Sequence, residues 1–422
     1  MEIDPTADHM ELDSATDDEM AIDPNPTPGL PTELVQQAMG ELPVEDRGRW
    51  GMTNKGMRGL VAAQPHDTPA GETQGLRHRT DVAPYRTIYT QKELDASLND
   101  PAPLHFAPGG GTAAEPLNLS RQASGGNVQL YGGVDEQPLA FVTGGYVNAR
   151  RGAVITDMHG GSVDLRAGAT IINKVGGRCD IWGGTVVNYY DAGGHLYENG
   201  TIVNQMSTDH LFVRNGRVEN FYKGSGDLYE ASRVTTVHGG KVFAWGTTVV
   251  DELLDGLVVL HDTSSVTAAK GGAIHAGAGS QVTEVSGGEV TLAPGAVVQT
   301  VTGGTVRAEH GATVHTSTGG DIHVGDQCVL HHADGSSFVL AYSGSTVTAS
   351  GNAQVHAEDG SIVTASGNAK VNAENGSTVT ISDSAEVSVH EGATVIAHSG
   401  TVILHSADAN LTNYGATVIE YS

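Results

Sequence analysis

The chain has 422 residues, of which 57 are glycine and only 5% are aromatic, and its two cysteines, Cys179 and Cys328, exclude a disulfide scaffold. A formal net charge of −27 argues against binding nucleic acid through a basic surface. Glycine does not recur at every third position, which excludes collagen. The sequence contains no run of about 18 apolar residues, so it predicts no membrane span. The N-terminus also lacks the basic and apolar regions of a secretory signal. We therefore expect a cytoplasmic or virion-associated protein, or one exported by a non-classical route.

The first 46 residues contain 13 acidic residues and no lysine or arginine. Within them, Met1–Asp4, Met10–Asp13 and Met20–Asp23 are three similar tetrads that place apolar residues among acids. Alternation of acidic and apolar residues is typical of disordered interaction segments. Residues 1–30 are therefore predicted to be a disordered acidic arm that docks to a protein partner. The competing interpretation is a tail that only keeps the protein soluble.

Two short helices are predicted before the first strand. Residues 32–42 can form one, in a segment, 31–84, that otherwise has the composition of a linker. Thr90 and Glu93 form a capping box that begins a second helix, which continues through Leu98 and is followed by a strand at Leu104–Phe106. Residues 85–103 resemble the N-terminal cap that precedes many right-handed parallel β-helices. Such a cap covers the edges that the first coil would otherwise expose.

From Val234 onwards an apolar residue recurs every eight positions, as far as Phe338. After a one-residue insertion, the series resumes at Val347 and continues to Val395, with a small or apolar residue two positions later in each octad. Residues i and i+2 of a strand point to the same side, so each octad predicts one short strand with two inward residues. Gly-Gly or Asp-Gly pairs recur every sixteen residues from 239–240 to 319–320, as expected of one tight corner per coil.

The predicted fold is therefore an all-β parallel β-solenoid (β-helix) with eight-residue strand units and sixteen-residue coils. Residues 104–233 are predicted to be irregular and residues 234–422 regular. The octads, such as Gly367–Glu374, resemble those of low-complexity β-solenoid proteins of actinobacteria and their phages. They also show a distant resemblance to the passenger repeats of autotransporter adhesins.

The segment 182–245 combines aromatic residues with carboxylates, as do carbohydrate-active β-helices, in which rings stack on sugars and acids protonate them or activate water. The candidate sugar-binding residues are Trp182, Tyr189, Tyr190, Tyr222 and Trp245, and the candidate catalytic residues are Asp191, Asp209, Glu219 and Asp227. The alternative is that the rings fill a wider coil or support loops.

Two histidines, His315 and His331, are one coil apart and are expected to stack about 5 Å from each other. They could share a metal ion, but the favoured interpretation is that they are ordinary surface histidines. Cys328 lies in a predicted corner and is interpreted as structural. No cofactor is expected.

The leading functional hypothesis is a non-enzymatic solenoid that serves as a rigid structural or interaction module, adhesin-like or phage-associated, with the acidic arm as its docking segment. The alternative is a polysaccharide hydrolase or lyase that uses the 182–245 cluster. Polysaccharide is therefore a possible ligand, and nucleic acid is not expected as a partner.

The docking hypothesis for the arm makes a prediction that charge alone does not. Replacing Ile3, Leu12 and Ile22 with serine leaves every charge in place. If the apolar residues dock, this triple variant should capture a partner at least about tenfold less well in a pull-down from the native host, because several weak contacts act together. Unchanged capture by the triple variant, together with loss on deletion of residues 1–30, would assign the effect to charge.

Overall fold

The computed structural model describes residues 86–102, 104–106, 117–120, 123, 128–130, 139–191, 194–406 and 408–420. They belong to one compact unit that begins at Arg86. The predicted arm (1–30) and the predicted short helix and linker (31–84) lie outside the described residues and stay predictions.

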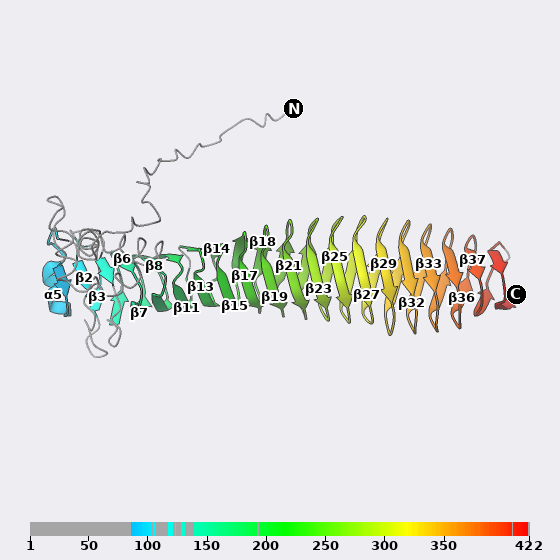
Figure 1. Cartoon of the computed structure of the whole chain (residues 1–422), viewed down its shortest axis with the longest axis horizontal. Helices are drawn as coiled ribbons and strands as arrows, with labels where there is room; N and C mark the ends of the chain where they lie inside the picture. The colour runs from blue at the N-terminus through cyan, green and yellow to red at the C-terminus, as the bar shows by residue number, and fades with distance from the viewer. Residues whose placement is uncertain are drawn as a thin grey trace, which may run out of the picture. The chain divides into compact units, whose positions relative to one another are not determined.

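The described chain winds into an elongated parallel β-solenoid of about 18 turns (Figure 1). Each turn contributes one strand to sheet A and one to sheet B, and every strand pairs in parallel with its equivalents in neighbouring turns. At roughly 4.8 Å per coil, 18 turns make a rod about 85 Å long. The predicted fold class and coil length are confirmed.

Sheet A contains 21 strands among the described residues, beginning with β1 (Arg86–Ile88). The other strands of sheet A are β2 (Leu104–Phe106), β4 (Val128–Leu130), β6 (Tyr146–Ala149), β8 (Ser162–Arg166), β10 (Arg178–Trp182), β12 (His195–Tyr197), β14 (His210–Arg214), β16 (Ser225–Tyr229), β18 (Lys241–Ala244), β20 (Leu257–Leu260), β22 (Ala273–Ala276), β24 (Glu289–Leu292), β26 (Thr305–Ala308), β28 (Asp321–Val324), β30 (Phe338–Ala341), β32 (Gln354–Ala357), β34 (Lys370–Ala373), β36 (Glu386–Val389), β38 (Thr401–Leu404) and β40 (Thr417–Glu420).

Sheet B is formed by the odd-numbered strands from β3 onwards. They are β3 (Leu117–Leu119), β5 (Leu139–Val142), β7 (Val154–Met158), β9 (Thr170–Lys174), β11 (Thr185–Tyr189), β13 (Thr201–Gln205), β15 (Arg217–Phe221), β17 (Arg233–Val237), β19 (Val249–Leu253), β21 (Ser265–Ala269), β23 (Gln281–Val285), β25 (Val297–Val301), β27 (Thr313–Ser317), β29 (Val329–Ala333), β31 (Thr346–Ala349), β33 (Ile362–Ala365), β35 (Thr378–Ile381), β37 (Thr394–Ala397) and β39 (Asn410–Asn413).

The predicted capping helix is α5 (Gln91–Ser97), and both hydrogen bonds of its capping box, between Thr90 and Glu93, are present. Its first residue closes the edge of sheet B. The Gln91 side-chain amide accepts a hydrogen bond from the Asn118 backbone N–H (2.7 Å) and donates one to the Asn118 carbonyl (3.2 Å). A single side chain thus takes the place of a neighbouring strand along β3, which is how a solenoid end avoids unpaired backbone groups.

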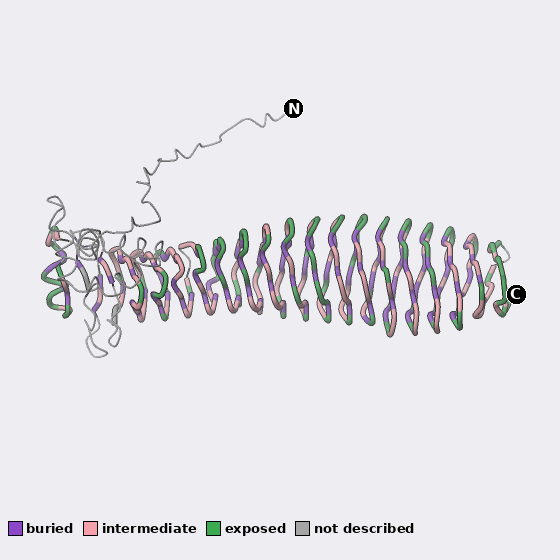
Figure 2. Tube along the Cα trace, in the orientation of Figure 1, coloured by how far each residue is buried: buried purple, intermediate pink, exposed green. Residues whose placement is uncertain are grey.

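Inward residues of the strands form one continuous core, and outward residues separate them along each strand (Figure 2). The predicted octad positions are buried from Val234 to Leu330 and again from Val347 to Val395. Phe338 was assigned wrongly. It is 41% exposed, whereas Val339 is fully buried and pairs with Ile322. The extra residue therefore lies before β30, in the turn 334–337, and not after it.

The cross-section of the coil changes at the same place. In β25 the inward residues are Val298 and Val301, with two outward residues between them, whereas in β33 they are Val363 and Ala365. The pairing of β29 with β31 contains the register shift that joins the two kinds of coil. The predicted i, i+2 pattern is confirmed for the last coils, and the earlier strands of sheet B use i, i+3.

The first coils of the region predicted to be irregular are longer than sixteen residues: β2 pairs with β4, β3 with β5 and β4 with β6 at offsets of 24, 23 and 19 residues. From β6 onwards coil length is nearly constant. Thr170 pairs with Val154 and Thr185 pairs with Thr170, so these coils have sixteen and fifteen residues. His195 pairs with Phe212, which makes a coil of seventeen. The sequence period breaks here because coil length varies, by several residues before β6 and by one residue after it, while the ladders of both sheets continue.

Glycine pairs form one corner in successive coils. The second glycine of each pair has a positive φ, as at Gly288 (78°) and Gly304 (77°). A Cβ on Gly304 would lie 2.8 Å from the carbonyl oxygen of Gly288, one coil earlier. Stacked corners therefore require glycine both for the backbone conformation and for space.

Two substitutions can separate the requirement for a positive φ from the requirement for space. Gly311 also has a positive φ (80°), but a Cβ there would meet nothing within 4 Å. Gly311→Ala should therefore cost only about 1–2 kcal/mol from backbone strain. Gly304→Ala adds the collision and should cost clearly more, measured as the free energy of unfolding in urea. Equal losses would show that contact between stacked corners is unimportant.

Candidate functional site

The aromatic residues of segment 182–245 are distributed over three places in the coil. Trp182 and Trp245 lie at the end of strands of sheet A. Tyr190 and Tyr222 follow strands of sheet B, so a whole strand of sheet A separates the two groups. Tyr189 is 1% exposed and belongs to the core. The ring of Tyr189, a candidate sugar-binding residue, is therefore closed off from a ligand.

The aromatic residues at the C-terminal ends of the sheet A strands belong to a ladder of flat side chains that runs along the rod, which we call the ring ladder. It consists of Arg166, Trp182, Tyr197, Arg214, Tyr229, Trp245 and His261. The Arg166 guanidinium lies 5.3 Å from the centre of the Trp182 ring, and Trp182 stacks on Tyr197 at 4.2 Å. Further along, Trp245 stacks on His261 at 3.7 Å, with their planes 6° apart.

The ring ladder presents edges rather than faces. Because adjacent rings stack along the rod, each covers the face of the next. A sugar stacks on the exposed face of a ring, and within the stacked pairs of this ladder those faces are occupied. At the opposite edge of the coil, Tyr222 is likewise stacked on His238 at 4.5 Å, whereas Tyr190 is 45% exposed.

The four candidate carboxylates occupy different surfaces. Asp191 and Asp209 lie in turns that follow β11 and β13. Glu219 lies on the outer side of sheet B and is 3.9 Å from Arg217. Asp227 lies on the outer side of sheet A, with an Oδ2 atom 3.1 Å from His210 Nε2. Glu219 and Asp227 therefore project from different sheets.

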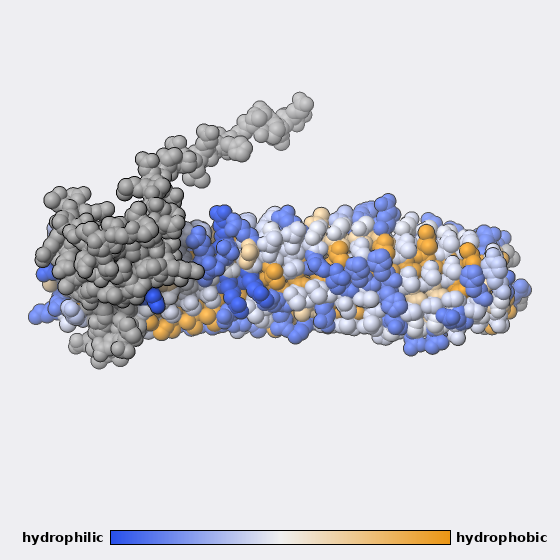
Figure 3. Space-filling view, in the orientation of Figure 1, coloured by the Kyte–Doolittle hydropathy of each residue, from blue (hydrophilic) through white to orange (hydrophobic). Residues whose placement is uncertain are grey.

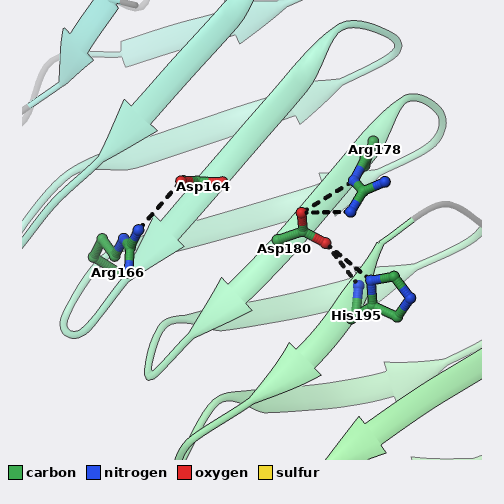
Figure 4. Close-up of polar contacts among 5 residues, drawn as sticks. All are labelled: Asp164, Arg166, Arg178, Asp180 and His195. Atoms are coloured by element: carbon green, nitrogen blue, oxygen red, sulfur yellow. Dashed lines mark hydrogen bonds and ion pairs between the residues drawn. The ribbon is translucent and has the colours of Figure 1, made fainter. Parts of the chain in front are cut away.

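A second carboxylate pair, missed in the sequence, lies on sheet A beside the ring ladder. Asp164 and Asp180 are direct neighbours in β8 and β10. Arg166 binds Asp164 at 3.2 Å, and Arg178 binds Asp180 at 3.0 Å (Figure 4). Asp180 also accepts a hydrogen bond from the His195 backbone N–H at 3.1 Å. Each charge is thus matched within the sheet, and the sixteen-residue spacing of the two aspartates was the available signal.

Asp164 has a further effect on Tyr146, which occupies the adjacent coil. Burial, followed by a hydrogen bond with Asp164, raises the pKa of Tyr146 to about 12. The hydroxyl therefore stays protonated at neutral pH and can only act as a hydrogen-bonding group. Tyr146, Asp164 and Arg166 therefore form a connected polar group on this face of the solenoid.

Sheet B carries a ladder of asparagines. Asn173 donates to Asp157 at 2.9 Å, and Asn188, Asn204 and Asn220 each donate to the preceding asparagine at 3.0–3.1 Å. One amide per coil both donates and accepts, so the hydrogen-bond chain continues along the rod. Ladders of this kind stabilise stacked parallel strands.

Polar residues also occupy core positions in the coils that carry the asparagine ladder. Lys174 is fully buried, donates to the Asp191 carbonyl at 2.8 Å and lies 4.6 Å from the centre of the Tyr189 ring. Burial lowers the pKa of its amine below the usual 10.5. Burial also raises the pKa of the Cys179 thiol to about 12, so this cysteine is not a reactive thiolate.

His315 and His331 stack at 5.1 Å, as expected from the coil length. Among the described residues, no group of three or more histidine, cysteine or acidic side chains is arranged to hold a metal ion. A metal ion shared by His315 and His331 would therefore have only these two protein ligands in the described part of the chain. Cys328 is buried, its Sγ lies 3.6 Å from the Asp326 carbonyl, and burial raises its pKa, in agreement with a structural role.

Three hollows lie along sheet A in the described part of the rod. One of about 410 Å³ is lined by Arg307, Glu309, His323, Gly325 and Tyr342, among others. Two others share Arg214 and Tyr229, with volumes of about 530 and 180 Å³. On the face of the rod that Figure 3 shows, hydrophilic areas alternate with small hydrophobic ones.

No protein-family model matches the chain, and no curated protein or solved structure matches it either. In the part of the chain that the structure describes, no helix is long and apolar enough to cross a membrane.

The buried amine of Lys174 yields a prediction for stability. In the preceding coil the equivalent residue is Met158, so Lys174→Met is compatible with the core. At pH 7 it should be as stable as the original chain or up to about 2 kcal/mol more stable, because burying a charge is costly. Lys174→Ala, which leaves a cavity, should be less stable by about 2–4 kcal/mol.

The pH dependence has a definite sign. Folding lowers the pKa of Lys174, so the unfolded chain binds more protons between that lowered pKa and 10.5. The unfolding free energy of the original chain should therefore rise with pH in this window, relative to Lys174→Met. Parallel pH profiles from urea titrations would show that the amine is not desolvated.

Proposed function

We propose that the chain serves as a rigid structural repeat module, a rod that sets a fixed distance between the molecules attached to it. The observation that carries this proposal is that outward side chains bind their equivalents in the next coil. The ring ladder and the asparagine ladder both run along the rod axis and add stiffness to two sheets that are already continuous.

This use of the outer surface favours a rod over a polysaccharide-cleaving enzyme. Cleavage of a glycosidic bond requires two carboxyl groups about 5–10 Å apart on either side of the sugar. Asp164 and Asp180 are adjacent, but each is bound by an arginine. The rings beside them are stacked on each other or on charged side chains. These features fit the surface of a stiff rod better than a sugar-binding groove.

The acidic arm extends this proposal. A rod that sets a distance needs an attachment at one end, and the apolar-acidic tetrads of residues 1–30 supply a segment suited to docking. An adhesin-like or virion-associated spacer, with protein partners, is the proposed class.

Removal of one complete coil tests the module directly. Deleting residues 297–312 joins Ala296 to Thr313, which takes the place of Val297 in the ladder. Because each coil contacts only its neighbours, the shortened chain should fold, keep most of its stability and lose about 5 Å of length. Small-angle X-ray scattering and the distance between labels on β8 and β34 measure the change.

The matched control removes half a coil. Deleting residues 297–304 brings β26 into the position of β25, although their inward residues have different spacings. This variant should unfold or lose most of its stability. If both deletions are tolerated equally, or if the full-coil deletion changes partner attachment without changing the measured length, the spacer proposal fails.

A further inference from the structure

Three polar side chains on sheet A form a relay that the ladders do not explain. His210 in β14 lies directly opposite Ser225 in β16. The Ser225 hydroxyl oxygen is 2.7 Å from His210 Nδ1, and His210 Nε2 is 3.1 Å from an Oδ2 atom of Asp227. Ser225 and Asp227 are two residues apart on one strand, so both project outward and the imidazole spans them.

The partners of His210 determine where its proton lies. The Asp227 carboxylate can only accept a hydrogen bond, so the neutral imidazole carries its proton on Nε2. Nδ1 then has a free lone pair and accepts the hydrogen bond from the Ser225 hydroxyl. A serine, an imidazole that can take its proton and a carboxylate that orients the imidazole are the elements of an activated nucleophile.

The surroundings leave this nucleophile accessible. Ser225 is only partly buried, and its neighbours along the chain are Gly224 and Gly226. A Cβ on Gly224 would lie 2.4 Å from the Ser207 carbonyl oxygen, and its φ is 84°, so the backbone requires glycine there. The side chain of His210 is 37% exposed and that of Asp227 is 24% exposed.

Positive charge and apolar surface lie on the neighbouring strands. Lys241 in β18 pairs directly with Ser225, on the side opposite His210, and is exposed. Its ammonium group can stabilise an anion that develops on a substrate bound to Ser225. Phe212 packs against the His210 ring at 4.6 Å and lines the hollow of about 180 Å³, which also includes Tyr197 and Tyr229.

We propose that Ser225, His210 and Asp227 form a nucleophilic site that hydrolyses carboxylic esters with a short acyl group. None of the three hollows described above is lined by Ser225, and the proposal therefore specifies a small acyl group. The hollow behind Phe212 accommodates an apolar or ring-containing alcohol.

The reaction is an acyl transfer in two steps. Ser225 Oγ bonds to the ester carbonyl carbon while its proton passes to His210 Nδ1. The tetrahedral oxyanion then re-forms the carbonyl, the carbon–alkoxide bond breaks and the alkoxide takes the proton from His210. Water next attacks the acyl-serine, gives a proton to His210, and the bond to Ser225 Oγ breaks as that oxygen recovers its proton. The products are a carboxylic acid and an alcohol.

The test uses the full chain with two probes, p-nitrophenyl acetate and a fluorophosphonate. With the fluorophosphonate, Ser225 Oγ bonds to phosphorus and fluoride leaves. Peptide mass spectrometry then locates the adduct. We expect the adduct on Ser225. Ser225→Ala should lose it, and its kcat/KM for the acetate should fall at least about 100-fold.

Two control variants lie on the same sheet. Ser162 occupies the equivalent strand position but pairs with Tyr146 and Arg178, and His275 is an outward histidine between Val259 and Thr291. Ser162→Ala and His275→Ala should keep the original rates. His210→Ala should lose labelling of Ser225, whereas simple hydrolysis by surface imidazoles would persist in Ser225→Ala.

Asp227 acts through His210 and is a positioning residue. Asp227→Asn should slow labelling at least about tenfold, and Asp227→Glu should restore part of the rate, which a purely structural role would not produce. All variants change outward residues, so thermal unfolding should stay near that of the original chain. Absence of a Ser225 adduct in the original chain, or equal labelling in His210→Ala, would overturn the proposal.

Discussion

Coil-to-coil register is the constraint on which the structure depends. Each strand pairs in parallel with its equivalent one turn away, so every side chain has copies of its own position as neighbours at about 4.8 Å. In the core this favours small and β-branched residues that repeat, as Val290, Val306 and Ile322 do. On the outside it favours groups that can bind a copy of themselves: amides, flat rings and paired opposite charges. The asparagine ladder and the ring ladder both satisfy this requirement.

The same constraint explains why the sequence predicted the core so well and the outer surface so poorly. An inward position has one environment, an apolar interior, so its period is visible in the residue type. An outward position such as Asp227 is defined by neighbours in two other coils, and coils of fifteen to seventeen residues move those neighbours relative to any fixed spacing. Asp191, Asp209 and Asp227 are evenly spaced in sequence, yet Asp227 lies on a strand and the other two lie in turns. His210 and Ser225 are fifteen residues apart and meet directly.

The wrong predictions for Phe338 and Tyr189 each have a physical cause at that position. Phe338 fits an apolar series in sequence, and its neighbour Val339 is equally apolar, so the position of the single insertion was ambiguous by one residue. The structure decides it because the turn 334–337 accommodates the extra residue while β30 keeps its register with β28. Tyr189 was grouped with surface rings because aromatic residues are rare in this core. It occupies a buried position next to Lys174, where a large ring covers an amine.

A rod and a reactive site place different demands on the same surface. Ladders require that the side chain in one coil resembles that in the next, whereas a nucleophile, a base and an orienting acid must differ. Such a site can form only where the repeat is interrupted. His210, Ser225 and Lys241 follow one another in a column of sheet A with no residue type repeated, and beside them Asp227 lies between two unlike neighbours, Phe212 and Phe243. These strands lie in the part of the solenoid where coil length varies, and downstream the repeat returns to sixteen. Variation in coil length therefore creates unlike neighbours, and unlike neighbours are what chemistry on a solenoid requires.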